Sequence, residues 1–323
     1  MAASELIVSI ASPRELEGTD LGPYDAVCLG NPYCRRVRGN YAEETALLPE
    51  AVSGLRGLGK KVYLTSPAAP RGRDLPQVDR LIDAAAAAGV QALEVHNMGV
   101  LRILREKGNP LPAHMGAYAN VYTHLAARVM RDYGAVRVRP NAEVGLQEME
   151  ILAREAGVEV EVLAHGKIPL GVTEKCSLLP GPEDADPNCP SACEEEHWLA
   201  ARRPAGRNGE SPRGGWVLKT VGKGILSGRD MCMLEHLPRL LSAGFSFFKI
   251  EGLYESAAYR SEVGRVYREA LDLASSGNTY RIPPEWVEML RRHSREGFCN
   301  GYYFGKSGKI YVGTVLQEGK PKV

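Results

Sequence analysis

The chain has 323 residues, of which 44% are hydrophobic and 24% are charged, with 40 lysines and arginines against 39 aspartates and glutamates. This composition is ordinary for a soluble globular protein, and a net charge of +1 argues against a dedicated binder of polyanions while leaving room for a local basic patch. The longest uncharged stretch, 108–127, contains prolines and histidines and does not predict a membrane span, and no secretory signal is visible, so we expect a cytoplasmic protein.

Short aliphatic runs alternate with longer amphipathic stretches, which is the pattern of repeated β–α units on a parallel sheet. The runs predict strands at 6–10, 26–29, 61–65, 92–96, 135–139, 158–164, 217–221 and 245–250, with a weaker pattern at 112–116. The amphipathic stretches predict helices over 43–58, 77–88, 121–133, 144–156, 231–243 and 257–273. Glycines such as Gly89 and Gly134 end helices and lead the chain into the next apolar run. This rhythm favours a (β/α)8 barrel over an open doubly wound sheet.

The segment from about 176 to 215 interrupts this rhythm, because it is rich in Pro, Gly, Asp, Glu and Arg and has no apolar period. It is typical of a long insertion between two barrel units. We therefore expect an α/β chain with one TIM-like barrel over 1–275, which carries this cysteine-bearing insertion, and a short helical or irregular C-terminal tail over 276–323.

Seven cysteines are present, and in a reducing compartment an odd number points to metal binding or reactivity before disulfides. Cys176, Cys189 and Cys193 follow the spacing C-x12-C-x3-C. Three thiolates are one ligand short of a tetrahedral set, and two thiols compete for the fourth place. Cys34 follows the second predicted strand, and Cys232 falls in the first turn of a predicted helix. Spacing alone leaves structural zinc, an iron–sulfur cluster and unliganded thiols open.

Polar side chains at the ends of predicted strands are further candidates, because barrel enzymes place catalytic groups there. Glu251 directly follows a strand, where it would act as a catalytic carboxylate or as the partner of a salt bridge. His165 would move a proton or bind an oxyanion, or be hydrogen-bonded for structural reasons alone. His96 and His114 occupy similar positions as candidates for substrate binding.

Three more residues are candidates for contact with a substrate. Asn120 would hold a substrate carbonyl or cap a helix. Arg35 and Arg36 flank Cys34, where their guanidinium groups would bind the carboxylates of an anionic substrate or simply be solvated.

Residues 159–176, EVEVLAHGKIPLGVTEKC, resemble the signature segment of the collagenase-like peptidase family, peptidase family U32. The likeness continues at 230–236, at 249–252 and at 267–272, in the same order along the chain. The better understood members of this family are similar to oxygen-independent hydroxylases that carry a [4Fe–4S] cluster and act on ubiquinone precursors or on RNA bases. The resemblance implies an enzyme of this kind.

Within that family the chain looks closest to the ubiquinone-biosynthesis V-type iron–sulfur subgroup. Pro169 stands where much of the family has a cysteine, and the run CLGNPYCRR at 28–36 supplies an early cysteine instead. The resemblance implies that the [4Fe–4S] ligands are Cys34, Cys176, Cys189 and Cys193. Cys232 is common elsewhere in the family but not in this subgroup, and it is the alternate ligand.

The function implied by the resemblance is hydroxylation of a small aromatic or quinone-precursor substrate without dioxygen. An electron donor or an oxygen-atom donor would take part, and the partner would be a paralogous subunit of the family or a second copy of the chain. Three alternatives stay open. The first is an RNA-base hydroxylase that uses an anionic oxygen donor such as prephenate, against which the near-neutral charge counts. The others are a peptidase, for which no nucleophile motif is evident, and a zinc-stabilised module without catalysis.

Overall fold

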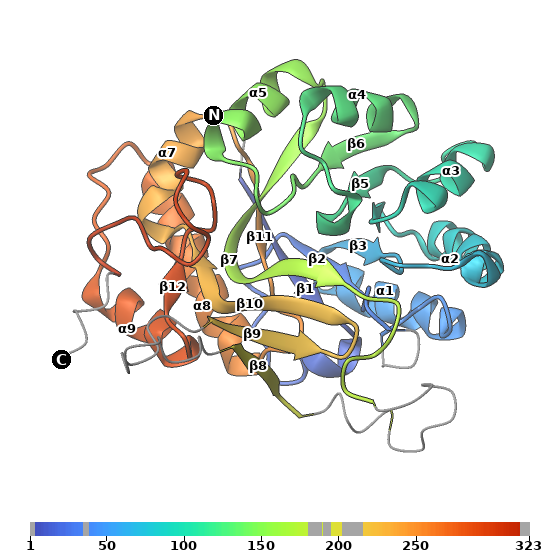
Figure 1. Ribbon diagram of the computed structural model, residues 1–323, viewed down its shortest axis with the longest axis horizontal. Helices are drawn as coiled ribbons and strands as arrows, with labels where there is room; N and C mark the ends of the chain where they lie inside the picture. The colour runs from blue at the N-terminus through green and yellow to red at the C-terminus, as the bar shows by residue number, and fades with distance from the viewer. Residues whose placement is uncertain (1–3, 35–38, 180–188, 190–194, 202–215, 317–323) are drawn as a thin grey trace, which may run out of the picture.

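The computed structural model describes residues 4–34, 39–179, 189, 195–201 and 216–316. Eight parallel strands form a closed ring in which β1 to β7 follow one another and β11 pairs with both β7 and β1 (Figure 1). The ring consists of β1 (Glu5–Ile10), β2 (Ala26–Leu29), β3 (Lys61–Thr65), β4 (Ala92–Val95), β5 (Ala113–Met115), β6 (Ala135–Val138), β7 (Glu159–Val172) and β11 (Phe247–Ile250). The predicted (β/α)8 barrel is confirmed.

Helices cover the outside of the ring, and the alternation of side chains along each strand separates two cores. The helices are α1 (Leu48–Gly57), α2 (Leu75–Ala88), α3 (Met98–Glu106), α4 (His124–Asp132), α5 (Leu146–Glu155), α7 (Leu237–Ser242) and α8 (Ala257–Ser275). Outward residues such as Leu6, Val8 and Val62 pack in the main core with the helices. A second, smaller cluster fills the barrel interior and consists of Ile7, Ala26, Cys28, Tyr63 and Ala92.

The ring differs from the predicted set of strands in one member. The weaker pattern at 112–116 contains the barrel strand β5, whereas the prediction that 217–221 is a barrel strand is wrong. That run lies in β9 (Trp216–Val221), which is antiparallel to its neighbours and lies outside the ring. An aliphatic run identifies a strand but not the strand with which it pairs.

An antiparallel sheet grows from one strand of the ring. β7 continues beyond His165, and this part of it pairs with β10 (Gly224–Cys232). β9 pairs with β10 on its other side, and β8 (His197–Ala201) pairs with β9. The prediction that Cys232 lies in a helical turn is therefore wrong, because 224–232 is a strand and α7 begins only at Leu237.

The C-terminal segment packs against the barrel and shares its core. It contains α9 (Pro284–His293) and the short strand β12 (Phe298–Cys299), which pairs with β10. Trp286, Leu290 and Phe298 are buried in the main core. Within the described ranges, no helix is both long and apolar enough to cross a lipid bilayer.

Candidate active site in the mouth of the barrel

Charged side chains fill the barrel interior near the C-terminal ends of its strands. Glu94 accepts hydrogen bonds from Arg139 at 3.2 Å and from Lys249 at 3.0 Å. Arg139 also lies 3.7 Å from Glu251 and 3.8 Å from Glu161. All five side chains are buried. Since active sites of (β/α)8 barrels lie at this end, the charge cluster is the leading candidate for a functional site.

The opposite charges in this cluster fix its protonation states. Although burial favours a neutral carboxyl group, Lys249 and Arg139 hold the pKa of Glu94 well below its ordinary value. Burial also opposes the charged guanidinium, yet Glu94, Glu161 and Glu251 raise the pKa of Arg139. Both groups are therefore ionised at neutral pH. In contrast, burial lowers the pKa of His96 to about 4, so its imidazole is neutral at pH 7.

Several buried polar atoms of the cluster have no hydrogen-bond partner in the described part of the chain. They are Nε and Nη1 of Arg139, Oε1 of Glu161 and Nδ1 of His96. The other ring nitrogen of His96 lies 3.0 Å from Thr65 Oγ1, so the ring is anchored on that side only. A buried polar group without a partner costs about 1–3 kcal/mol, and native proteins seldom leave several together. The arrangement is typical of a site that a polar ligand completes.

Three tyrosines from loops at the strand ends close the mouth above this cluster. Tyr118 donates a hydrogen bond from its hydroxyl to the Tyr33 hydroxyl at 3.1 Å, and the two rings meet edge to face at 5.9 Å. The Tyr254 ring lies 6.2 Å from the Tyr33 ring, and its hydroxyl accepts a hydrogen bond from Asn31 at 2.6 Å. Tyr254 holds a left-handed φ of 60°, which is costly for a bulky residue. The mouth therefore has an aromatic rim over a polar interior.

The carboxylate of Glu251 faces the barrel interior. The Ser9 hydroxyl donates a hydrogen bond to it, and Arg139 Nη1 lies 3.7 Å away. Because Glu251 directly follows β11, its carboxylate is held between the interior cluster and the rim. The geometry is compatible with both predicted roles, a catalytic carboxylate and a salt-bridge partner.

The side chain of His165, in contrast, lies on the outside of the barrel wall. Its Nδ1 lies 3.2 Å from the Tyr267 hydroxyl, and its ring packs 6.0 Å from the Phe298 ring. Burial lowers the pKa of His165 to about 3, so the ring is neutral. The structure therefore does not bring His165 and the Glu251 carboxylate into one site, and the hydrogen bond to Tyr267 agrees with the structural role that was the alternative.

The remaining sequence candidates lie in different places. His96 belongs to the interior cluster, whereas His114 lies next to Tyr63, with ring centroids 4.7 Å apart, and burial lowers its pKa well below the ordinary value. Asn120 is exposed, ends the short helix η4 (Ala117–Ala119) and accepts a hydrogen bond from Asn141 at 3.0 Å. It is a cap at the surface, so a contact with a substrate inside the mouth is not supported. Arg35 and Arg36 lie outside the described residues.

Cys34 and Cys176 flank the same turn between β9 and β10. Cys34 is buried and follows Tyr33, whose ring packs so closely on the turn at 222–224 that a Cβ on the last residue would overlap it. On the other side, Ser177 donates a backbone hydrogen bond to the turn at 3.0 Å, directly after Cys176. The fold thus brings two of the predicted thiol ligands to one end of the barrel.

Cys232 lies at the opposite end of β10 from this turn. Seven residues lie between it and Gly224, and eight steps of about 3.3 Å give a span of at most roughly 26 Å, which the irregular pairing of β10 with β7 shortens. It is fully buried, its sulfur lies 3.5 Å from the Tyr267 hydroxyl, and burial raises its pKa to about 12. Cys232 therefore cannot share an ion or cluster with Cys176 in this fold, which argues against its predicted role as alternate ligand.

Cys189 is buried, and Cys193 lies outside the described residues. Among the residues whose placement is described, no three His, Cys, Asp or Glu side chains are close enough together to hold a metal ion. Thiols at 34 and 176 suit an iron–sulfur cluster chemically, but the described geometry does not assemble a full set. The four-cysteine ligand set stays a prediction.

The centre of the cluster was not predicted from the sequence. Glu94, Arg139 and Lys249 lie inside runs that predict apolar strands, and the rim tyrosines lie in loops. A usable signal was present, because charged residues stand at alternate positions in two of the predicted strands, 135–139 and 158–164, and so share one face.

Known proteins are similar to this chain along most of its length. The model of peptidase family U32 matches residues 23–312. The chain is 26% identical over 350 residues to tRNA hydroxylation protein P of Escherichia coli, a match that covers 92% of this chain and 77% of the relative. It is 27% identical over 270 residues to an uncharacterised protease of Methanocaldococcus jannaschii, covering 82% of this chain and 64% of that protein.

A solved U32 peptidase structure is 12% identical, with a TM-score of 0.47, and the match covers 79% of this chain and 94% of that one. The chain spans less than two thirds of the archaeal relative, so the activity of a whole relative does not transfer to it directly. The match of the family model along most of the sequence nevertheless settles the family. The chain is a member of peptidase family U32.

Proposed function

We propose that this chain is a hydroxylase that acts on a nucleobase of RNA in the mouth of the barrel, with a [4Fe–4S] cluster held at the rim by Cys34, Cys176, Cys189 and Cys193. The observation that carries the substrate site is the set of buried atoms on Arg139, Glu161 and His96 that lack a hydrogen bond in the described part of the chain, beneath an aromatic rim. The name of the E. coli relative, a tRNA hydroxylation protein, supports RNA over the quinone precursor that the sequence alone favoured.

The mixture of donors and acceptors favours a neutral ring over a dianion. The interior holds the carboxylates of Glu94, Glu161 and Glu251 against the cations Arg139 and Lys249, and His96 is neutral. No surplus of positive charge is available for a dicarboxylate at this point. The edge of a nucleobase offers both hydrogen-bond donors and acceptors. It can therefore complement the guanidinium, carboxylate and imidazole atoms that lack a hydrogen bond.

Each element of the mouth has a role in this proposal. Enzymes that modify bases take the base out of its stack and hold it between aromatic side chains, which Tyr33, Tyr118 and Tyr254 would provide once the hydrogen bond between the first two opens. Arg139 would donate to a ring carbonyl, and Glu251, oriented by Ser9, would accept the proton that the ring carbon loses when an oxygen-atom donor, itself reduced by two electrons, supplies the oxygen of the new hydroxyl group. The cluster, when bound, would supply the redox chemistry.

The test is a nucleoside analysis under anaerobic conditions. The chain is expressed in a host that lacks its own RNA hydroxylases, and digested RNA is searched by mass spectrometry for nucleosides with one added oxygen atom. We expect such a nucleoside with the wild type and with Arg102→Met, an exposed control on α3, and a loss of at least tenfold with Arg139→Met.

Two results would overturn the proposal. If the RNA stays unmodified while an added quinone precursor is hydroxylated, the substrate is a small aromatic molecule and not RNA. Full activity of Arg139→Met would show that the barrel mouth is not the site. A gelatin-degradation assay on the same preparation tests the peptidase alternative that the name of the archaeal relative suggests.

A further inference from the structure

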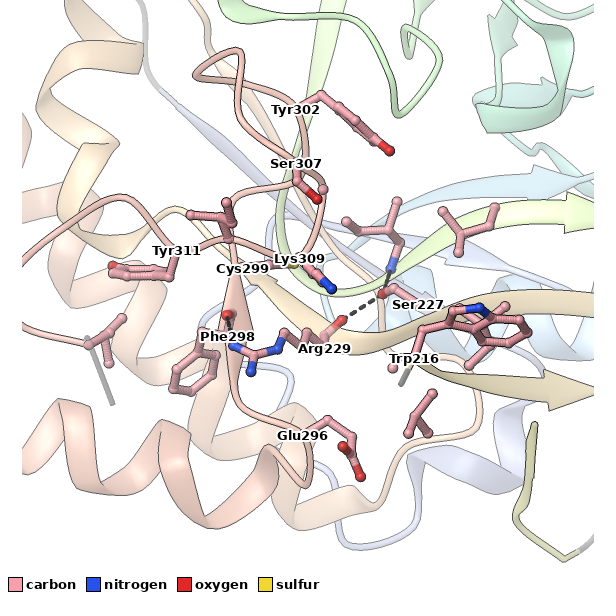
Figure 2. A pocket seen from close by; sticks show the side chains of 18 residues that line it. Trp216, Ser227, Arg229, Glu296, Phe298, Cys299, Tyr302, Ser307, Lys309 and Tyr311 are labelled. Carbon is pink, nitrogen blue, oxygen red and sulfur yellow. Dashed lines mark hydrogen bonds between the residues drawn. The ribbon is translucent and has the colours of Figure 1, made fainter. Parts of the chain in front are cut away.

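A hollow lies between the antiparallel sheet of β7, β9 and β10 and the C-terminal segment that contains Phe298 and Lys309 (Figure 2). Neighbouring residues of a strand point to opposite faces. On β9, Leu218 lines the hollow, whereas Lys219 donates a hydrogen bond to the Tyr254 carbonyl on the mouth side. On β10, Ser227 lines the hollow, whereas Leu226 packs with the rim tyrosines. One layer of sheet therefore separates the two places.

The hollow is a cavity of about 690 Å³, which is large enough for a nucleotide. Its floor is apolar and comes from β7, β9 and β10, and its far wall is the segment 296–311. We name it the outer groove. Ser227 fixes the floor, because its hydroxyl accepts a hydrogen bond from the Ile168 amide at 2.8 Å and donates one to the Arg229 carbonyl at 2.6 Å.

Two aromatic side chains on the outer groove are unusually exposed. Trp216, at the start of β9, is 51% exposed, and Tyr302, in the far wall, is 38% exposed. The Tyr302 ring lies against Gly308, where a Cβ would come within 2.8 Å of it, so the loop holds the ring in place. Large aromatic surface left open beside a cavity is typical of a binding site.

The charged side chains of the outer groove include two cations. Arg229 and Lys309 line the groove together with the carboxylate of Glu296, which lies 3.6 Å from Arg295. Lys309 is exposed, and Figure 2 shows its side chain extending into the hollow. In the described part of the chain, Lys309 forms no ion pair, so its charge is available to a ligand. Cations beside exposed aromatic rings complement single-stranded nucleic acid.

We propose that the outer groove binds a single-stranded stretch of RNA, with Trp216 and Tyr302 stacking on bases and Lys309 contacting a phosphate. This inference rests on the proposed function in one respect: the stretch bound is taken to belong to the RNA whose base enters the mouth. Because one sheet layer separates groove and mouth, a few nucleotides suffice to connect them around its edge. The groove would then hold the RNA while the mouth receives the target base.

The test is a fluorescence titration of the full chain with a short single-stranded RNA oligonucleotide, which needs neither a cluster nor an oxygen donor. Stacking on one aromatic side chain is lost in Trp216→Ala and in Tyr302→Ala, so each should bind about 5- to 150-fold more weakly, measured by anisotropy of a labelled oligonucleotide. Lys309→Gln should reduce the slope of log K against log salt by about 0.7. Tyr122→Ala, which removes a 44% exposed tyrosine that follows η4 and does not line the outer groove, is the control and should bind like wild type.

Wild-type affinity in both aromatic variants, with circular dichroism spectra that show them folded, would overturn the proposal. So would displacement of the oligonucleotide signal by an apolar peptide but not by unlabelled RNA, which would identify the groove as a peptide site. The two proposals fail separately. If the wild type hydroxylates RNA but the aromatic variants bind RNA normally, only the proposal about the outer groove is refuted. If the aromatic variants bind RNA more weakly but the wild type hydroxylates no RNA, only the proposed function is refuted.

Discussion

Replacement of Arg139 by methionine leaves the carboxylates of Glu94, Glu161 and Glu251 together in the barrel interior with Lys249 as the neighbouring cation. Removing one partner of a buried ion pair costs about 3–5 kcal/mol, because the remaining charge stays out of water. An unfolding entropy of about 2.1 cal/mol/K per residue over 323 residues amounts to about 0.7 kcal/mol/K. The melting temperature should therefore fall by about 4–7 °C at pH 7.

The difference in melting temperature between wild type and Arg139→Met should become smaller at acidic pH. The folded-state pKa of Glu94 is depressed, so its contribution to stability is present above the unfolded value near 4.5 and disappears as the pH falls through the folded value. Without Arg139 the pKa of Glu94 is less depressed, and the variant loses less stability on acidification than the wild type. The difference in melting temperature is largest at neutral pH and narrows once the pH falls below the folded-state pKa of Glu94 in the variant, which lies below the ordinary value of 4.5.

Thermal unfolding followed by circular dichroism at pH 7 and at a series of pH values below 4.5 measures both effects. Arg102→Met removes an exposed arginine of α3 that pairs with Glu106, and it should change the melting temperature by less than about 1.5 °C, since exposed ion pairs contribute about 0–1 kcal/mol. Arg139→Lys keeps the cation and should recover part of the loss. Equal melting temperatures of wild type and Arg139→Met at pH 7, or a difference that does not depend on pH, would refute this account of the cluster.

Three further outcomes are expected. In anaerobically purified protein, Cys176→Ala should lose most of its iron while Cys232→Ala keeps it, and equal loss in both would contradict their separation along β10. Gly116→Ala places a Cβ on the His96 ring and should lower stability to urea by about 1–3 kcal/mol, so an unchanged midpoint would show that the ring can move. Burial holds the pKa of His165 at about 3, so the unfolded chain binds a proton below pH 6.5 that the folded chain does not. Stability should therefore fall by about 1.4 kcal/mol per pH unit between pH 6 and 4, and His165→Gln should remove that part of the slope in urea titrations.

The barrel was predictable because its local signals agree with its global arrangement. Buried parallel strands are aliphatic runs, and a glycine such as Gly89, which takes a left-handed φ of 76° after α2, marks the end of a helix in the sequence. β10 was not predictable in this way, since its Ser227, Arg229 and Asp230 are polar and their burial depends on partners distant in sequence. The same limit explains why 217–221 was assigned to the ring.

The candidate site was predictable only at its edge. Glu251 and His96 stand at strand ends, where the fold class alone points to function. Alternation along the strands could place Arg139 on the inward face, but its pairing with Glu94 could not be predicted, because only the closed ring brings the two strands together. The orientation of His165 was equally inaccessible, since the irregular pairing of β7 with β11 decides which face of the wall it takes.

The two edges of β7 change partners at the same residue. β11 pairs with one edge up to His165, whose carbonyl accepts a hydrogen bond from the Glu251 amide. β10 pairs with the opposite edge from His165 onward, and the Ala164 carbonyl there accepts a hydrogen bond from the Met233 amide. A single continuous strand therefore carries both the barrel wall and the inserted sheet, and the backbone of β7 around His165 sets the position of that sheet relative to the mouth.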